Sequence, residues 1–241
     1  MKTSRFFTRM NKETARRQWS DRFNNRALAG REPKRAKINA LADGGVEILL
    51  YDEIGFWGIT ATEFVNQLNA IDAPSITVRI NSPGGDVFDG IAIHAALIRH
   101  PATITIHIDG LAASAASFIA LAGKTVVMSE SALMMVHCAW GFAIGNKSDM
   151  LETATILEKI DGQLGDIYAK KSGKTPAECL TMMAGDGKND GTWFTAEEAK
   201  EWGLVDEIAS GDDGEDESEQ AAMQLKVMAM KRRLALAAHD D

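Results

Sequence analysis

Two hydroxyl side chains lie inside a run of small residues in the segment DGLAASAASFIALAG, residues 109–123. Ser114 follows a β-like stretch and a glycine-containing turn and precedes a helical run, so the sequence predicts that it sits at a helix N-terminus. Free backbone N–H groups at such a position favour negative charge developing on a substrate. Its small neighbours would let a substrate backbone come close, which makes Ser114 a candidate nucleophile. A serine here is also a common N-cap, and the segment alone does not decide between the two roles.

A second candidate is the loop NSPGGD, residues 81–86, which follows another predicted strand. The adjacent Gly84 and Gly85 permit positive φ and leave backbone N–H groups bare. Such donors could form an oxyanion hole, which stabilises the charge of a tetrahedral intermediate. An ordinary tight turn is the alternative. The loop does not match the phosphate-binding spacings G-x-x-x-x-G-K-[ST] and G-x-G-x-x-G.

His137 closes the predicted strand ALMMVH, residues 132–137, where it could act as a general base for a serine. It could also be a histidine of the core or rim. The spacing of the five histidines does not match a zinc motif such as H-E-x-x-H, so no metal site is predicted. The other four lie in a predicted helix, inside a strand or in the C-terminal tail: His94, His100, His107 and His239.

The elements that must position these residues alternate between strands and helices, which predicts an α/β fold with a mainly parallel sheet and right-handed crossovers. In such sheets, sites lie in loops after the carboxyl ends of the strands, and the loops 81–86 and 109–114 both qualify. Strands are predicted at 46–54, 75–80, 102–108, 125–130, 132–137, 192–195 and 204–208. Helices are predicted at 60–71, 87–100, 148–173, 175–183 and 196–203, and from about residue 114.

The two ends of the chain differ in charge from its middle. Residues 1–37 carry twelve Lys and Arg against three acids, whereas residues 212–219 carry six acids and no base. We therefore expect a basic N-terminal arm over 1–44, one folded domain over 45–209, and an acidic linker with a helical tail over 210–241. The arm could dock on acidic surfaces of a partner or of a neighbouring subunit.

Composition narrows the class of protein further. The 241 residues are 45% hydrophobic and 25% charged, with a net charge of −8, which argues against a surface built for nucleic acid. Two cysteines form no disulfide framework, so a reducing compartment fits. The first residues lack the apolar run of a secretory signal, and no segment is typical of a membrane span. These features predict a soluble cytoplasmic protein without a membrane partner.

Four segments, in this order and at these separations, resemble the ClpP family of serine peptidases, and most of all the ClpP-like head maturation proteases of tailed phages and prophages. The segments are INSPGGDVFDGIAIHAALI, GLAASAASFIALAG, ALMMVH and FTAEEAKEWGLVDEI, within residues 45–208. The resemblance implies the ClpP/crotonase-like fold of repeated β-α-β units with flanking helices, and a serine endopeptidase that needs no metal or organic cofactor.

The resemblance also implies roles for individual residues. Ser114 matches the nucleophile and His137 the base. The backbone of Gly85 and Ala115 matches the oxyanion-hole donors. Pro83 and Gly84 match the loop along which a substrate strand is laid. Ser117 lies about one helical turn beyond Ser114 and is expected to be a packing or capping hydroxyl.

The third member of the triad is where this sequence departs from the family pattern. Counting back from FTAEEA places the acid at Gly191, and counting forward from Gly173 places it at Asp186. The disagreement between the two counts predicts a short insertion in the stretch GDGKNDGTW. Asp190 is the preferred candidate because it adjoins the following strand, and Asp186 is the alternative. Either would orient His137 and stabilise its charged form.

The resemblance implies a ring-forming homo-oligomer that cleaves capsid and scaffold proteins during head assembly, in the bacterial host cytoplasm or the phage procapsid. Whether an ATPase partner feeds the ring is left open. Two other functions remain on the sequence: a catalytically silent ClpP-fold assembly or scaffold protein, and a crotonase-type acyl-CoA enzyme. Neither of these two would react with a serine-directed fluorophosphonate.

Overall fold

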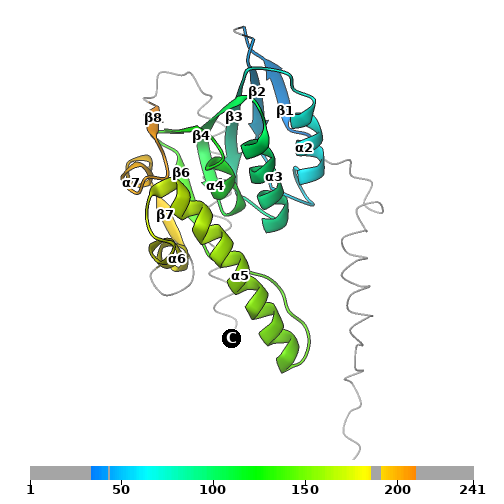
Figure 1. The fold of residues 1–241 in the computed structure, drawn as a ribbon, viewed down its shortest axis with the longest axis vertical. Coiled ribbons are helices and arrows are strands. Elements are labelled where there is room, and N and C mark those ends of the chain that lie inside the picture. Colours follow the sequence, from blue (N-terminus) through cyan, green and yellow to red (C-terminus); the bar gives the residue numbers. More distant parts are fainter. Residues whose placement is uncertain (1–33, 43, 186–190, 210–241) are drawn as a thin grey trace, which may run out of the picture. The chain divides into compact units, whose positions relative to one another are not determined.

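A single mostly parallel sheet organises the part of the chain that the computed structural model describes, residues 34–42, 44–185 and 191–209 (Figure 1). Its main path runs in the order β1-β2-β3-β4-β5-β8, while β6 pairs with β4 and β7. Only the β1–β2 and β6–β7 pairs of this sheet are antiparallel. The strands are β1 (Lys37–Ala40), β2 (Val46–Leu50), β3 (Ser75–Ser82), β4 (Thr103–Ala113), β5 (Thr125–Ser129), β6 (Leu133–Val136), β7 (Thr192–Phe194) and β8 (Glu207–Ala209).

Helices connect the strands, so the α/β architecture with a mainly parallel sheet, as expected from the alternating pattern, is confirmed. The longest helix begins at an Asn146 cap that shares a capping box with Asp149, and it ends at Gly173, whose φ of 72° a glycine adopts without strain. The described helices are α2 (Ala61–Asn69), α3 (Val87–Arg99), α4 (Ala115–Ala120), α5 (Lys147–Ser172), α6 (Pro176–Ala184) and α7 (Ala196–Glu201).

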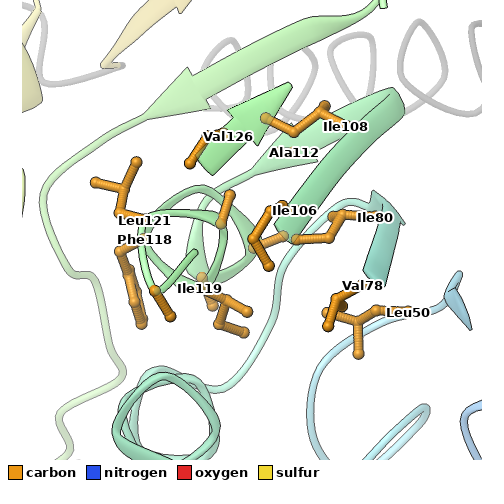
Figure 2. Close-up of a cluster of buried hydrophobic side chains, with 14 of the residues drawn as sticks. Leu50, Val78, Ile80, Ile106, Ile108, Ala112, Phe118, Ile119, Leu121 and Val126 are labelled. Carbon is orange, nitrogen blue, oxygen red and sulfur yellow. The ribbon is translucent and has the colours of Figure 1, made fainter. Parts of the chain in front are cut away.

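The core packs the sheet against the helices α2, α3 and α4 and continues into buried residues of α5, α6 and α7. Alternate residues are buried along β3 and along the first part of β4, to Ile108, as the period of a half-buried strand requires. Figure 2 shows α4, with Phe118 and Ile119, beside inward-facing side chains such as Ile80 and Ile106. All four side chains are at most 2% exposed, so the short helix that follows Ser114 is anchored by apolar packing.

Strand β4 has two different partners along one edge. Thr105–Ile108 pair with β5, and Leu111–Ala113 pair with β6. The sequence predicted only residues 102–108 as this strand, and the structure continues it to Ala113. The extension carries the chain directly to Ser114, whose N–H donates to the carbonyl oxygen of Met135 on β6 at 2.9 Å.

Strand β1 was not expected, because Lys37–Ala40 lies within the segment assigned to the N-terminal arm. It pairs antiparallel with β2 as the edge of the sheet. The predicted tail over 210–241 and most of the arm lie outside the described residues. None of the helices in the described ranges is long and apolar enough to cross a membrane.

Candidate active site

Ser114 and His137 meet at the carboxyl ends of β4 and β6. The Oγ atom of Ser114 lies 2.7 Å from Nε2 of His137, a hydrogen-bond distance. Their strands are parallel neighbours, with Ala113 opposite Met135, so each side chain follows just beyond the last paired residues. The register of this ladder therefore brings together two residues that are 23 positions apart.

Ser114 occupies the N-cap position of α4 but does not act as a cap. Its φ of 53° and ψ of −124° differ from the extended backbone of a normal N-cap, and its side chain makes no capping hydrogen bond with the helix. Among the described residues it is the only non-glycine with positive φ. Of the two roles that the sequence left open, the geometry favours the candidate nucleophile.

A chain of hydrogen bonds connects the backbone carbonyl of Ser114 to α5. The Oγ of Ser117 donates to the carbonyl oxygen of Ser114 at 2.6 Å and lies 2.6 Å from the hydroxyl oxygen of Tyr168 on α5. Because the single proton of Ser117 goes to that carbonyl, the Tyr168 hydroxyl donates to Ser117. Ser117 is thus a buried hydroxyl that links Ser114 to Tyr168. The sequence did not predict that Tyr168 supports Ser114.

The glycine loop lies against Ser114. A Cβ on Gly84 would be 2.4 Å from the carbonyl oxygen of Ala113 and 2.7 Å from Cβ of Ser114, so only glycine fits there. Ile54 donates its N–H to the carbonyl of Gly84 and accepts the N–H of Asp86. In such a parallel pairing, the N–H of the intervening Gly85 points away from Ile54.

Ala115 is the other residue whose N–H is predicted to belong to the oxyanion hole. It is the first residue of α4, so its N–H belongs to the donors that have no acceptor within the helix. The structure thus places Ser114, His137, Ala115 and the loop Pro83–Gly84–Gly85 in one region. Asp190 and Asp186, the two candidates for the acid, lie outside the described residues.

Burial lowers the pKa of His137, and the negative charge of Asp161 opposes this effect. A lowered pKa keeps the imidazole neutral, and therefore able to accept a proton, at neutral pH. The other described histidines lie elsewhere: His94 on α3, His100 at its C-terminal end, and His107 within β4. Within the described ranges no three or more His, Cys, Asp and Glu side chains gather to hold a metal ion.

The sequence profile of the Clp protease family matches residues 38–212. The chain belongs to the Clp protease family. The four segments that resemble the family lie within the matched region, so the predicted membership of the Clp protease family is confirmed.

Individual Clp relatives agree with the profile. The ATP-dependent Clp protease proteolytic subunit of Chlorella vulgaris is 37% identical over 135 residues, which cover 55% of this chain and 64% of that subunit. The subunit of the same name from Bacteroides fragilis is 33% identical over 172 residues, or 66% of this chain and 80% of that subunit. That of Pleurastrum terricola is 32% identical over 174 residues, or 67% and 86%.

Proposed function

We propose that this protein is a serine endopeptidase that hydrolyses peptide bonds through an acyl-enzyme. The observation that carries the proposal is the 2.7 Å contact between Oγ of Ser114 and Nε2 of His137, made by a serine at positive φ beside glycine backbone. Membership of the Clp protease family supports the same activity. Neither a silent scaffold protein nor an acyl-CoA enzyme would require this pair.

In the proposed reaction, Ser114 Oγ attacks the carbonyl carbon of the peptide while its proton passes to Nε2 of His137. The N–H groups of Gly85 and Ala115 stabilise the oxyanion. When the tetrahedral intermediate collapses, His137 gives the proton to the departing amine and an ester to Ser114 remains. Water then attacks this ester and gives a proton to His137, which again acts as base. As the bond from the carbonyl carbon to Ser114 Oγ breaks, His137 returns the proton to Oγ, and the carboxylic acid leaves.

Pro83 and Gly84 would hold the substrate strand beside Ser114, because Gly84 lies directly against Ser114 and has no side chain to block the approach. Asp190 remains our preferred third member of the triad, with Asp186 as the alternative. No cofactor takes part in the proposed steps.

We further propose a ring-forming homo-oligomer. Large apolar side chains are exposed along the segment after His137 and on the first half of α5, a pattern typical of protein interfaces. They are Trp140, Phe142, Ile144, Met150, Leu151 and Ile156, of which the first three are 71%, 75% and 73% exposed.

The biological role that we propose is maturation of phage or prophage heads, with capsid and scaffold proteins as substrates in the host cytoplasm or procapsid. It rests on the resemblance of the four segments within residues 45–208 to the head maturation proteases of tailed phages and prophages. The relatives named above are called ATP-dependent subunits, so an ATPase partner is the alternative way of delivering substrate. Incubation with the cognate capsid and scaffold proteins tests the head-maturation role.

A fluorophosphonate probe tests the chemistry without knowledge of the substrate. We expect the wild-type protein to be labelled at one site and Ser114→Ala to lose the label completely, because the probe requires an activated serine. Ser131→Ala, at an exposed serine in a turn, is the matched control and should be labelled like wild type. Labelling that persists in Ser114→Ala would rule out Ser114 as the nucleophile, and an unlabelled wild type would favour a silent scaffold protein.

A further inference from the structure

An acidic side chain on α5 reaches the backbone directly after His137. Oδ1 of Asp161 accepts the N–H of Ala139 at 2.6 Å. Ala139 is two residues beyond His137, in the segment that leaves β6. A half-buried carboxylate from a different element is thus tied to the short stretch that carries the candidate base.

The charge of Asp161 acts on both residues that precede Ala139. It is the charge that raises the pKa of His137 against the effect of burial. Burial and the same carboxylate, which also accepts a hydrogen bond from the thiol, raise the pKa of Cys138 to about 11. These effects agree with the position that the contact to Ala139 gives to Asp161.

Strand β7 is the neighbour of β6, and the residue directly before β7 has no room for a side chain next to His137. Gly191 precedes β7, and its φ is 78°. A Cβ at this position would lie 2.1 Å from the carbonyl oxygen of Val136 and 2.6 Å from Cβ of His137. Residue 191 therefore cannot provide a carboxylate here without moving the backbone. Within the described residues, the carboxylate that acts on His137 comes from α5.

We propose that Asp161 is a positioning residue that fixes the segment after His137 through Ala139 and supplies the negative charge that balances the imidazolium during turnover. This inference rests on the proposed function, in which His137 becomes positively charged in each half of the reaction. An opposite charge held near a partly desolvated imidazole favours its protonated form. Asp161 acts on the reaction only through His137.

Two substitutions separate the charge from the hydrogen bond. Asp161→Asn keeps an oxygen that can accept the N–H of Ala139 and removes the charge, whereas Asp161→Ala removes both. Asp166→Asn, at an exposed position of α5, is the matched control for loss of one negative charge from this helix. Circular dichroism establishes that each variant is folded.

The first readout is the titration of the His137 imidazole by NMR. Within the described residues, the hydroxyl of Ser114 contacts the imidazole, Asp161 is the charge that acts on it, and Cys138, next in the chain, carries a thiol whose pKa is raised. Loss of a favourable charge destabilises the imidazolium, so Asp161→Asn should lower the pKa of His137 by roughly one unit. Asp166→Asn should leave it unchanged.

The second readout is the rate of fluorophosphonate labelling against pH. Labelling requires neutral His137, so its acid limb should move to lower pH in Asp161→Asn by the same shift. The plateau rate should fall roughly tenfold, the factor that corresponds to one pKa unit. Asp190→Asn and Asp186→Asn, measured alongside, report the contribution of the other two candidate acids.

The proposal is overturned if Asp161→Asn leaves both the His137 titration and the acid limb where they are in wild type. It is also overturned if only Asp161→Ala loses activity without any shift in pH, because Asp161 would then be a purely structural anchor. If wild type is not labelled at all, the proposed function fails, and the NMR titration still decides whether Asp161 sets the charge state of His137.

Discussion

Ser114 holds a backbone conformation that costs an L-residue of this kind about 1–3 kcal/mol. Three observed contacts keep it there: its N–H donates to Met135 on β6, and its carbonyl accepts both the N–H and the Oγ of Ser117. Tyr168, fully buried, completes the chain from α5. Burial raises the pKa of Tyr168, so its hydroxyl stays protonated and remains a donor. The strain at the nucleophile is thus offset by direct hydrogen bonds from β6 and α4, and α5 supports them through Ser117.

Tyr168→Phe should therefore weaken both stability and reactivity. Loss of the buried hydroxyl leaves Ser117 without its donor, and we expect the free energy of unfolding in urea to fall by about 0.5–1.5 kcal/mol. Fluorophosphonate labelling of Ser114 should slow several-fold, because the carbonyl contact from Ser117 is then less well held.

A double-mutant cycle provides the control for this prediction. Ser117→Ala and Tyr168→Phe act through one chain of bonds, so their effects on stability should be less than additive when combined. Strict additivity would mean that Tyr168 stabilises the protein by packing alone.

At the scale of single residues, the sequence predicted Ser114 and His137 as candidate nucleophile and base, but it did not predict the residues that hold them in place. Ser114 and His137 could be found because Ser114 lies in the loop after one predicted strand and His137 closes another, and parallel strands bring their carboxyl ends together. Asp161 and Tyr168 lie in a helix whose periodicity tells only which face is apolar. Which backbone or hydroxyl groups they reach depends on how α5 packs, and no local pattern in the sequence contains that information.

At the scale of elements, the helices were predicted best. Their caps are local: Thr60, Asp86 and Asn146 each accept backbone N–H groups of the following turn. Strand β4 was predicted too short because Gly110, Ala112 and Ala113 are small residues, and the stretch lacks the branched side chains typical of a strand. Leu111–Ala113 form a strand because β6 pairs with them, and each partner residue lies 22 positions further along the chain.

The cap of α3 allows a test at this scale, because it adjoins Gly85 of the expected oxyanion hole. Oδ1 of Asp86 accepts the N–H groups of Phe88 and Asp89, each at 2.9 Å. Asp86→Ala should lower the free energy of unfolding by about 1 kcal/mol, measured by urea denaturation. Asp86→Asn keeps the accepting oxygen and should lie close to wild type. Equal losses in the two variants would show that the charge, and not the cap, is what α3 needs.

At the scale of the whole molecule, the structure shows that the folded domain begins earlier than the boundary at residue 45 that the sequence predicted. Ala36 is 4% exposed and exchanges two hydrogen bonds with the Gln67 side chain of α2, at 3.1 and 2.9 Å. Lys37 begins β1. A deletion that preserves the sheet should therefore remove residues 1–33, which carry nine Lys and Arg and three acids, and leave residue 34 onward intact.

The deletion of 1–33 should leave the rate of labelling at Ser114 unchanged and weaken self-association or binding to an acidic partner. Sedimentation at several salt concentrations measures this, because charge attraction fades as the Debye length falls to about 8 Å at physiological salt. The deletion of 1–37 is the comparison, and it should unfold more easily by about 1–3 kcal/mol since it removes the Ala36 contacts. Loss of labelling in the shorter deletion would assign the arm a part in the active site.

The two partners of β4 also bear on how this protein can evolve. The first part of β4, Thr105–Ile108, pairs with β5, which in turn pairs with β8. The last part, Leu111–Ala113, pairs with β6 and leads directly to Ser114, while β6, which also pairs with β7, leads to His137. The pairs between β4 and β6, which set Ser114 beside His137, are formed by chain that precedes α6. A change in length between α6 and β7 therefore leaves the nucleophile and the base in register, so the position of the acid can vary between related sequences while the serine and histidine stay together.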